Sequence, residues 1–327
     1  MKKLCITSLS VFLCLGFFCL GMVQAAEKYP VKPLECILGV EAGADGDVIA
    51  RPILQKVSAI IGQPIMVVNK PGAGSSIAYR AVHDAKPDGY TFGWGSATII
   101  TNKLQGILPY DYHEFTQLGV FTTYFPIIVA STKGPRQFKT IQEVIAFGKA
   151  NPGELSMATA GIGQSWWVAA TSFIEGTGLK INAIPQAGAG AVTVAQVAGG
   201  HTDLGVVALG SGKAMIDGGQ VRFLATLGEQ RAAAPYDNIP TVKELGYNVS
   251  WESANFFMGP RNMPKHAVDV LVKAIYTASH DPAYQKFCAE RNSRWGYIPP
   301  DKVVEDFDKR RTVVREIMRK AGILKEK

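Results

Sequence analysis

Two glycine-containing turns are the segments of this sequence whose residues are best suited to bind a small molecule. The first turn, Val40 to Asp47, follows an apolar run of strand length that begins at Cys36, and the second extends from Thr159 to Ser165. Each precedes a segment with a helical pattern. A turn from strand to helix exposes backbone N–H groups where the helix dipole favours negative charge. We therefore expect the two turns to face each other across a cleft and to hold the carboxylate of a small molecule.

The helix after the first turn is predicted from the spacing of its apolar residues. Ile49, Ile53 and Val57 recur at every fourth position, which places them on one helix face. Asp47 is of the residue type that commonly caps a helix N-terminus, and we expect it to cap this helix. Pro52 lies early in the same helix, where it removes one backbone hydrogen bond.

The sequence contains no recognisable set of catalytic or metal-binding residues. Its five histidines are scattered, and none lies in a His-Glu-x-x-His motif. Gly210-Ser211-Gly212-Lys213 resembles the end of a phosphate-binding loop, but Val207 and Ala214 stand where that loop needs glycine and a hydroxyl residue. No serine lies in a Gly-x-Ser-x-Gly motif. We therefore predict no catalytic residue, no metal and no cofactor, and an enzyme on an α/β scaffold is the less favoured alternative.

The N-terminus has the features of an export signal. Lys2 and Lys3 precede an apolar run from Leu4 to Val23, and Val23-Gln24-Ala25 has the small-residue pattern of a signal-peptidase site. We expect residues 1–25 to be a signal peptide that is removed on export. The alternative is a retained membrane anchor, because the apolar run is long enough to span a bilayer.

Composition and charge argue against several protein classes. The 327-residue chain has a formal net charge of +7, but its basic residues are dispersed and those near the C-terminus alternate with acidic ones, which argues against a nucleic-acid-binding face. Without the signal, about 300 residues remain, enough for two lobes with separate cores. Two cysteines also remain, Cys36 and Cys288. We favour two separate buried thiols, with a disulfide between them as the alternative.

Short apolar runs alternate with helical patterns along the rest of the chain. This alternation predicts α/β lobes in which a mainly parallel sheet is covered by helices. Two strand-like runs meet near Pro126, a candidate crossover to a second lobe, and we expect the chain to return past Pro240. Lobe 1 would then comprise residues 27–126 and 249–327, and lobe 2 residues 127–248. Lobes joined by more than one crossing have the geometry of a hinged cleft that closes on a ligand.

A series of short motifs resembles a known protein family. In order along the chain they are Tyr29-Pro30-Val31-Lys32-Pro33, Asp47-Val48-Ile49-Ala50-Arg51, Gly62-Gln63-Pro64, Asn69-Lys70-Pro71-Gly72-Ala73-Gly74, Pro87-Asp88-Gly89-Tyr90-Thr91, Leu108-Pro109-Tyr110-Asp111, Gly199-Gly200-His201-Thr202-Asp203-Leu204, Ile239-Pro240-Thr241-Val242 and Ala321-Gly322-Ile323. They resemble the Bug family, the periplasmic receptors of tripartite tricarboxylate transporters, and the match covers essentially the whole mature chain.

The resemblance implies a periplasmic-binding-protein fold of type II that closes on a small carboxylated solute in the periplasm. The solute would be a di- or tricarboxylate or an aromatic carboxylate. The receptor, expected to be a monomer, would deliver it to a permease with one large and one small inner-membrane subunit. The alternative is an exported sensing module of the same fold that serves a membrane kinase.

The turns and the resemblance together suggest three groups of ligand-binding residues. The first turn supplies Val40, Gly43, Ala44, Asp45 and Asp47. The second lobe supplies Thr159, Gly161, Gly163, Gln164, Ser165, Trp166, Trp167, Gln186 and Val207. Flanking polar candidates are Ser75, Ser76, Ser96 and Thr98.

The chain departs from the family pattern at positions that bear on the ligand. Val207-Ala208 stands where the family frequently has Asp-Asn, and Trp167, preceded by Trp166, stands where it usually has His. The site thereby loses an acidic group that would bind an amino group, and it gains indole surface. The departures suggest a carboxylate without an α-amino group, which can be aromatic and stack on Trp166 or Trp167. The alternative is that one or both tryptophans pack in the core.

Overall fold

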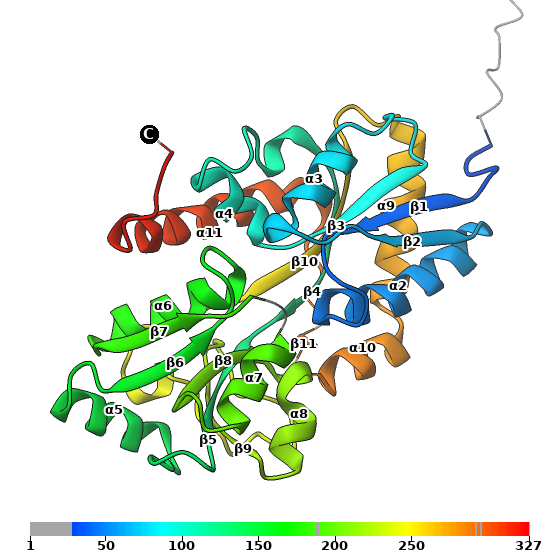
Figure 1. Ribbon diagram of the computed structural model, residues 1–327. Helices are drawn as coiled ribbons and strands as arrows, with labels where there is room; N and C mark the ends of the chain where they lie inside the picture. The colour runs from blue at the N-terminus through cyan, green and yellow to red at the C-terminus, as the bar shows by residue number, and fades with distance from the viewer. Residues whose placement is uncertain (1–27, 188–189, 292, 295, 327) are drawn as a thin grey trace, which may run out of the picture.

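The chain folds into two lobes, each built on a β-sheet flanked by helices (Figure 1). The computed structural model describes residues 28–187, 190–291, 293–294 and 296–326, so the expected signal peptide lies outside the described residues. Within those ranges, no helix is long and apolar enough to cross a membrane. The two-lobed α/β fold expected from the sequence is confirmed.

The first sheet, counted over the described residues, has six strands in the order β11–β4–β10–β3–β1–β2. Its strands are β1 (Leu34–Leu38), β2 (Ile65–Asn69), β3 (Thr91–Gly95), β4 (Phe115–Tyr124), β10 (Ser253–Pro260) and β11 (Ser293–Arg294). The helices of this lobe are α2 (Asp45–Ile61), α3 (Ser76–His83), α4 (Thr98–Leu104), α9 (Lys265–Ser279), α10 (Pro282–Ala289) and α11 (Pro300–Lys320), with the short 3₁₀ turns η1 (Ala73–Ser75) and η2 (Tyr112–Glu114). Buried apolar strands such as β1 thus alternate with amphipathic helices such as α2.

The second sheet, within the same described ranges, has five strands in the order β7–β6–β8–β5–β9. Its strands are β5 (Pro126–Ser131), β6 (Leu155–Thr159), β7 (Ile181–Pro185), β8 (Leu204–Ala208) and β9 (Val221–Thr226). Its helices are α5 (Ile141–Ala150), α6 (Ser165–Thr177), α7 (Gly190–Ala198) and α8 (Leu209–Asp217), and the 3₁₀ turn η3 (Lys243–Leu245) follows β9.

Both sheets are mixed, which refines the expectation of mainly parallel sheets. β1 pairs in parallel with β2 and β3, and β6 pairs in parallel with β7 and β8. β10 and β5 run antiparallel to the strands on either side of them. Phe125 alone separates β4 of the first sheet from β5 of the second, so the chain passes directly from one sheet into the other. In the second sheet, β5 runs antiparallel to its neighbours β8 and β9, and an antiparallel strand does not need the long crossover connection of a parallel pair.

The two passages of the chain between the sheets lie side by side. The first passage is at Phe125, and the second is the segment between β9 and β10. The Leu227 N–H donates to the Pro126 carbonyl oxygen at 3.0 Å, and the Trp251 N–H donates to the Leu227 carbonyl oxygen at 2.7 Å. Adjacent connections of this kind form a hinge about which two lobes can close.

The start of α2 corrects the expectation that Asp47 caps this helix. The helix begins at Asp45, and the extended residue before it, Ala44, is the N-cap. Asp47 is the third helical residue, and its carboxylate accepts a hydrogen bond from the Gly43 N–H at 2.9 Å. A carboxylate at this position can reach back to the chain before the helix, as in a capping box. Asp47 therefore braces the preceding turn. Pro52 is accommodated inside the helix.

The buried core extends through both lobes. One apolar cluster includes Trp167 of α6, Leu204 of β8 and Phe307 of α11, so it joins elements of the two sheets. Cys36 in β1 and Cys288 in α10 belong to a second cluster in the first lobe. Both are buried free thiols, as the sequence analysis favoured.

Candidate ligand-binding site

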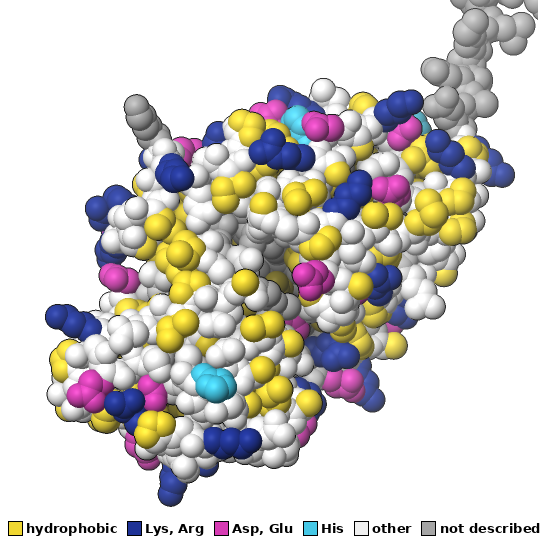
Figure 2. All heavy atoms as spheres, viewed as in Figure 1, with side chains coloured by type: hydrophobic (Ala, Val, Ile, Leu, Met, Phe, Trp, Pro, Cys, Tyr) yellow, Lys and Arg dark blue, Asp and Glu magenta, His cyan; other side chains and the backbone are white. Residues whose placement is uncertain are grey.

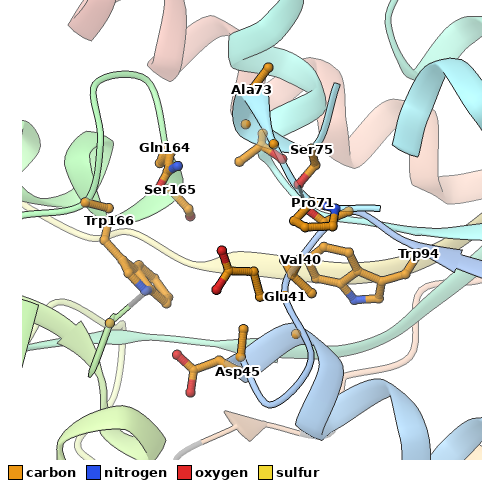
Figure 3. Close-up of a pocket in the computed structure, with 18 of the residues that line it drawn as sticks. Val40, Glu41, Asp45, Pro71, Ala73, Ser75, Trp94, Gln164, Ser165 and Trp166 are labelled. Atoms are coloured by element: carbon orange, nitrogen blue, oxygen red, sulfur yellow. Dashed lines mark hydrogen bonds between the residues drawn. The ribbon is translucent and has the colours of Figure 1, made fainter. Parts of the chain in front are cut away.

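A cavity of about 280 Å³ lies between the lobes. Figure 2 shows the molecule hollowed between its lobes, and Figure 3 shows the side chains around the cavity. The first lobe contributes residues from the segments 39–46 and 71–75, and the second lobe contributes the start of α6. Residues of both glycine-containing turns therefore meet at one cavity.

The N-termini of α2 and α6 both reach this cavity. Asp45 and Gly46 open α2, Ser165 and Trp166 open α6, and all of them line the cavity. Neither helix has a side-chain hydrogen bond from its N-cap residue, so backbone N–H groups of both first turns are available to a ligand. α5 and α10 are each capped by a side chain, but α3, α4, α8, α9 and α11 also lack a side-chain cap, so α2 and α6 are distinguished by their convergence on the cavity. Two uncapped helix N-termini that converge on one cavity can bind an anion.

Asp47 braces the first turn from outside the cavity. Its carboxylate accepts hydrogen bonds from the Gly43 N–H at 2.9 Å, from Arg51 Nε at 2.8 Å and from Asn69 Nδ2 at 2.9 Å. Asn69 Nδ2 also donates to the Val40 carbonyl oxygen at 3.0 Å. Burial alone would raise the pKa of the Asp47 carboxyl group, but these hydrogen bonds and the Arg51 charge hold the pKa below its usual range. The turn is thus held in position before a ligand binds.

Two carboxyl groups of the first lobe reach the cavity. Figure 3 shows the Glu41 side chain projecting from the first turn, with Asp45 below it. Ser211 of α8 donates from Oγ to the Asp45 carboxylate at 2.6 Å, and this hydrogen bond joins the two lobes. Loss of water around Asp45 raises the pKa of its carboxyl group, and the hydrogen bond from Ser211 and the charge of Arg291 offset part of that rise.

The wall of the cavity is acidic, and one of its acidic residues, Asp45, is among the residues suggested from the sequence. The second lobe has no acid at Val207, but Glu41 and Asp45 supply carboxyl groups from the first lobe. No lysine, arginine or histidine of the described residues lines this cavity. Positive potential in the cavity therefore comes from the helix N-termini and not from cationic side chains.

The segment 72–75 forms a strained wall of the cavity. Ala73 and Ser75 have φ values of 45° and 72°, a conformation that costs a non-glycine residue about 1–3 kcal/mol. Ser75 Oγ donates to the Gly39 carbonyl oxygen at 2.9 Å. A Cβ atom at Gly39 would lie only 2.4 Å from the Ser75 Cβ atom, so this contact requires glycine.

Aromatic side chains line the cavity on both sides. Trp166 of α6 and Trp94 of β3 lie on opposite sides in Figure 3. Tyr124, at the end of β4, contacts the Trp166 ring edge to face, with ring centroids 5.0 Å apart. Trp94 Nε1 donates to Asn255 Oδ1 at 3.2 Å. Both tryptophans belong to the buried core cluster, but only Trp166 also lines the cavity, so it is the tryptophan of this pair that can contact a ligand.

The structure brings some of the suggested residues together and separates others from the cavity. Val40, Ala44, Asp45, Ser75, Thr98, Gln164, Ser165 and Trp166 line it. Gly43 lines a neighbouring cavity, which Asp45 also reaches. Asp47, Ser76, Ser96, Thr159, Gly161, Gly163, Trp167, Gln186 and Val207 lie outside both cavities.

Several of the residues outside the cavities have identifiable structural roles. Val207 is buried in the core of the second lobe. Ser96 forms a hydrogen bond with the Thr98 hydroxyl group at 3.0 Å and so supports a residue that does line the cavity. Gly163 has a φ of 80°, which favours glycine in the second turn.

Sequence reasoning missed other residues of the cavity wall. Trp94 lies at the carboxyl end of β3. Ligands of α/β sheets bind outside the carboxyl ends of parallel strands, so the position of Trp94 could have identified it as a candidate. Nothing in the sequence identifies Tyr124 as a candidate, because it reaches the cavity only through the direct passage from β4 to β5.

The family comparison agrees with this geometry. A family model described as "Tripartite tricarboxylate transporter family receptor" matches residues 49–303 of the chain. The chain belongs to this family. Curated relatives of this receptor include a UPF0065 protein of the gbd 5' region from Cupriavidus necator, 28% identical over 280 residues that cover 84% of this chain and 83% of the relative. Protein BugT of Bordetella pertussis is 27% identical over 306 residues, covering 92% of this chain and 91% of BugT.

Solved structures share the fold of this family receptor. The periplasmic binding protein BugD is 26% identical with a TM-score of 0.79, covering 91% of this chain and 100% of BugD. The R. palustris protein Rpa4515, solved with adipate, is 23% identical with a TM-score of 0.82, covering 90% of this chain and 99% of that protein. The resemblance to the Bug family and the periplasmic-binding-protein fold are confirmed.

Proposed function

We propose that this protein is an exported receptor that captures a small carboxylated solute between its lobes, with lobe boundaries near residues 126 and 248. The observation that carries the proposal is the convergence of two uncapped helix N-termini, from α2 and α6, on one cavity between the lobes. Membership of the receptor family supports it, as does the presence of adipate in a solved protein of the same fold. The signal peptide at residues 1–25 would direct the receptor to the periplasm. There it would deliver the solute to the large and small membrane subunits of a tripartite tricarboxylate-type transporter.

The ligand carboxylate would accept hydrogen bonds from backbone N–H groups in the first turns of both helices. Each helix N-terminus contributes about 0.3–1 kcal/mol to binding an anion, and more where the site is partly buried. Because the two N-termini belong to different lobes, the complete set of donors exists only when the lobes are closed. The ligand therefore favours the closed state, since only a difference in affinity between states can shift their populations.

The rest of the ligand would lie against aromatic surface. Trp166 closes the cavity on the side of the second lobe, and Trp94 lies opposite it. The cavity of about 280 Å³ is close to the lower end of the usual range for small-molecule sites. It suits a compact aliphatic or aromatic carboxylate.

Proline at the first position of α6 tests the role of the backbone donors. Ser165→Pro removes one N–H group at a position where proline fits a helix, and the extended conformation of Gln164 before it is compatible with proline. Ser165→Ala is the matched control, because it loses the same hydroxyl group and keeps the N–H. Titration calorimetry with adipate, malate and benzoate should show carboxylate affinity about tenfold weaker in Ser165→Pro than in Ser165→Ala.

Uncharged analogues provide the complementary measurement. The primary amides of the same acids should bind at least about tenfold more weakly to the wild-type receptor, because they lack the negative charge that the helix N-termini favour. Equal binding of acid and amide, or equal affinities of the proline and alanine variants, would contradict the proposed site. Mass spectrometry of the solute that co-purifies with the receptor would identify the ligand directly.

A further inference from the structure

One face of α4 carries the wall of the ligand cavity at one end and Gln105 at the other. Thr98, the first residue of the helix, lines the cavity, and Asn102 Nδ2 donates to the Gly74 carbonyl oxygen in the cavity wall at 2.8 Å. Gln105 is the C-cap residue of the helix. Because residues 98, 102 and 105 are spaced four and three positions apart, they lie on the same helix face.

The Gln105 side chain crosses from the first lobe to the second turn. A Cβ atom added at Gly163 would lie 2.0 Å from Gln105 Nε2, 2.7 Å from its Cδ and 2.8 Å from its Oε1. These separations are shorter than van der Waals contacts, so the carboxamide group already occupies the space beside the Gly163 Cα atom. The half-buried Gln105 side chain therefore packs directly on the backbone of a turn that belongs to the other lobe.

This contact lies outside the ligand cavity but next to its proposed donors. Gln105 and Gly163 both lie outside the ligand cavity and the neighbouring cavity. Gly163 is followed directly by Gln164 and Ser165, which do line the ligand cavity. The contact can therefore hold the second turn in position without touching a solute.

Residues near the C-terminus hold the end of α4. The N–H groups of Lys325 and Glu326 both donate to the Leu104 carbonyl oxygen, at 2.9 and 3.1 Å. The Glu326 carboxylate accepts hydrogen bonds from Arg311 and Arg315 of α11. A helix C-terminus leaves carbonyl groups without partners inside the helix, so these bonds fix the last turn of α4. The C-cap side chain thus reaches the second lobe from a fixed position.

The lobes are joined in two separate places. The hydrogen bond from Ser211 to Asp45 joins α8 to α2, whereas Gln105 joins α4 to the turn before α6 (Figure 1). We propose that Gln105 is a positioning residue that holds the second turn once the lobes close and so slows the release of the solute. This inference rests on the proposed function, in which the second turn supplies backbone donors to the ligand.

The position of the contact predicts which rate constant it controls. A solute enters while the lobes are apart, before Gln105 reaches Gly163, and it leaves only after this contact has broken. The contact is therefore absent on entry and present in the bound state. It acts on the rate of dissociation and leaves the rate of association almost unchanged.

Binding kinetics of the mature receptor test the role of Gln105. Gln105→Ala removes the carboxamide, and Gln142→Ala makes the same change at an exposed position of α5. Stopped-flow tryptophan fluorescence can follow binding, because Trp94 and Trp166 line the cavity. With adipate and with malate, Gln105→Ala should raise the dissociation rate about fivefold and leave the association rate within about twofold. Gln142→Ala should change neither rate.

A second substitution tests whether the effect passes through the second turn. The methyl group of Gly163→Ala would occupy the place of the Gln105 carboxamide and displace it. In this background Gln105→Ala should raise the dissociation rate less than about twofold further. Gly178→Ala is the matched control, because its φ is 68° and no atom of the described residues lies within 4 Å of the added Cβ. There Gln105→Ala should keep its full effect.

The outcomes separate this inference from the proposed function. If Gln105→Ala releases the solute at the wild-type rate, or mainly slows association, the role of Gln105 is overturned and the receptor function stands. Equal effects of Gln105→Ala in the Gly163→Ala and Gly178→Ala backgrounds would overturn it as well. Circular dichroism and the midpoint of urea unfolding check the fold, and if Gly163→Ala does not fold, the rates of Gln105→Ala alone decide. If the wild-type receptor binds neither acid, the proposed function fails and this inference fails with it.

Discussion

The two turns that meet at the ligand cavity offer similar backbone groups but are held in place differently. The first turn is braced by charge, because Asp47 accepts hydrogen bonds from the turn and from Arg51, while Asp45 reaches across to the other lobe. The second turn contains no charged residue. There the Gln164 N–H donates to the Gly161 carbonyl oxygen at 2.9 Å.

The start of the helix after the second turn is held by a neutral bond as well. Trp251 Nε1 donates to Ser165 Oγ at 3.0 Å, and Trp251 belongs to the segment that returns to the first lobe. An anion site made of backbone N–H groups can therefore be held by a buried carboxylate or by uncharged hydrogen bonds. Only the first arrangement depends on pH. The predictions that follow test this difference between the turns.

The largest expected effect is in the pair of tryptophans after the second turn. Trp167→Ala should lower the free energy of unfolding by about 3–5 kcal/mol, because it empties a buried core position. Trp166→Ala should also destabilise the protein, since Trp166 belongs to the same cluster, and it should in addition weaken ligand binding about tenfold because it removes part of the cavity wall. Urea denaturation and calorimetry measure the two effects. A loss of affinity in Trp167→Ala larger than that in Trp166→Ala would contradict the assignment.

The next largest effect is in the brace of the first turn. Asp47→Ala should lower the free energy of unfolding by about 2–3 kcal/mol, because it leaves the Gly43 N–H without its acceptor and removes one of the two acceptors of Asn69 Nδ2. Ligand affinity should fall with it as the turn loosens. The control is Asp269→Ala, which breaks the exposed pair with Lys265 and should cost less than about 0.5 kcal/mol. If urea denaturation showed equal losses of unfolding free energy in Asp47→Ala and Asp269→Ala, Asp47 would not be a brace of the first turn.

The two aspartates of α2 should respond to pH in opposite directions. The folded pKa of Asp45 is raised, so its contribution to stability is complete below its unfolded pKa of about 3.9 and is lost as pH rises through the folded value. Asp45→Asn should therefore stabilise the protein at pH 7 and stabilise it much less at pH 4. The folded pKa of Asp47 is lowered, so Asp47→Asn should destabilise the protein at pH 7, with a loss that shrinks as pH falls.

The second turn provides the control for this pH dependence. Ser165→Ala removes the acceptor of the Trp251 hydrogen bond and should cost about 1 kcal/mol at both pH values, because neither group titrates in this range. Thermal and urea denaturation at pH 4 and pH 7 measure all three variants. If Asp45→Asn destabilised the protein at pH 7, or if the stability lost in Ser165→Ala depended on pH, the proposed difference between the two turns would be contradicted.

The smallest expected effect concerns the exposed acid of the first turn. Glu41→Gln should strengthen carboxylate binding by about twofold to threefold at low ionic strength, because it removes a negative charge from the cavity wall. The gain should disappear in about 0.5 M salt, which screens exposed charges. Glu175→Gln makes the same change at an exposed position of α6 that does not line the cavity, and it should leave affinity unchanged.

Local features of the fold were predictable from the sequence, whereas contacts between distant segments were not. The alternation of strands and helices, the two strand-to-helix turns and the burial of Cys36 and Cys288 all follow from residues close together in the chain. The hydrogen bond between Asp45 and Ser211 joins residues 166 positions apart. The spacing of apolar residues indicates which face of a segment is buried, but not which distant segment packs against it. The inter-lobe contacts and the mixed sheets could therefore not be predicted from the sequence.

The two tryptophans show a local limit of sequence reasoning. An amphipathic helix reveals its inward face through the spacing of its polar residues. The first six residues of α6, from Ser165 to Ala170, are all buried, so no exposed residue shows which face of the helix points inward. Adjacent tryptophans then look equivalent in the sequence, although both are buried in the core and only Trp166 also borders the cavity.

The bond from Ser211 to Asp45 has a consequence for the sensitivity of the receptor. It links the halves of the molecule without any contribution from a solute, and so it helps to set the resting fraction of molecules that are already shut. Apparent affinity scales with that fraction for every solute alike. Weakening this bond would lower that fraction and so raise the dissociation constant of every solute. Asp45 and Ser211 also line the cavities, so a substitution at either residue changes the threshold of response and the contacts with the solute together.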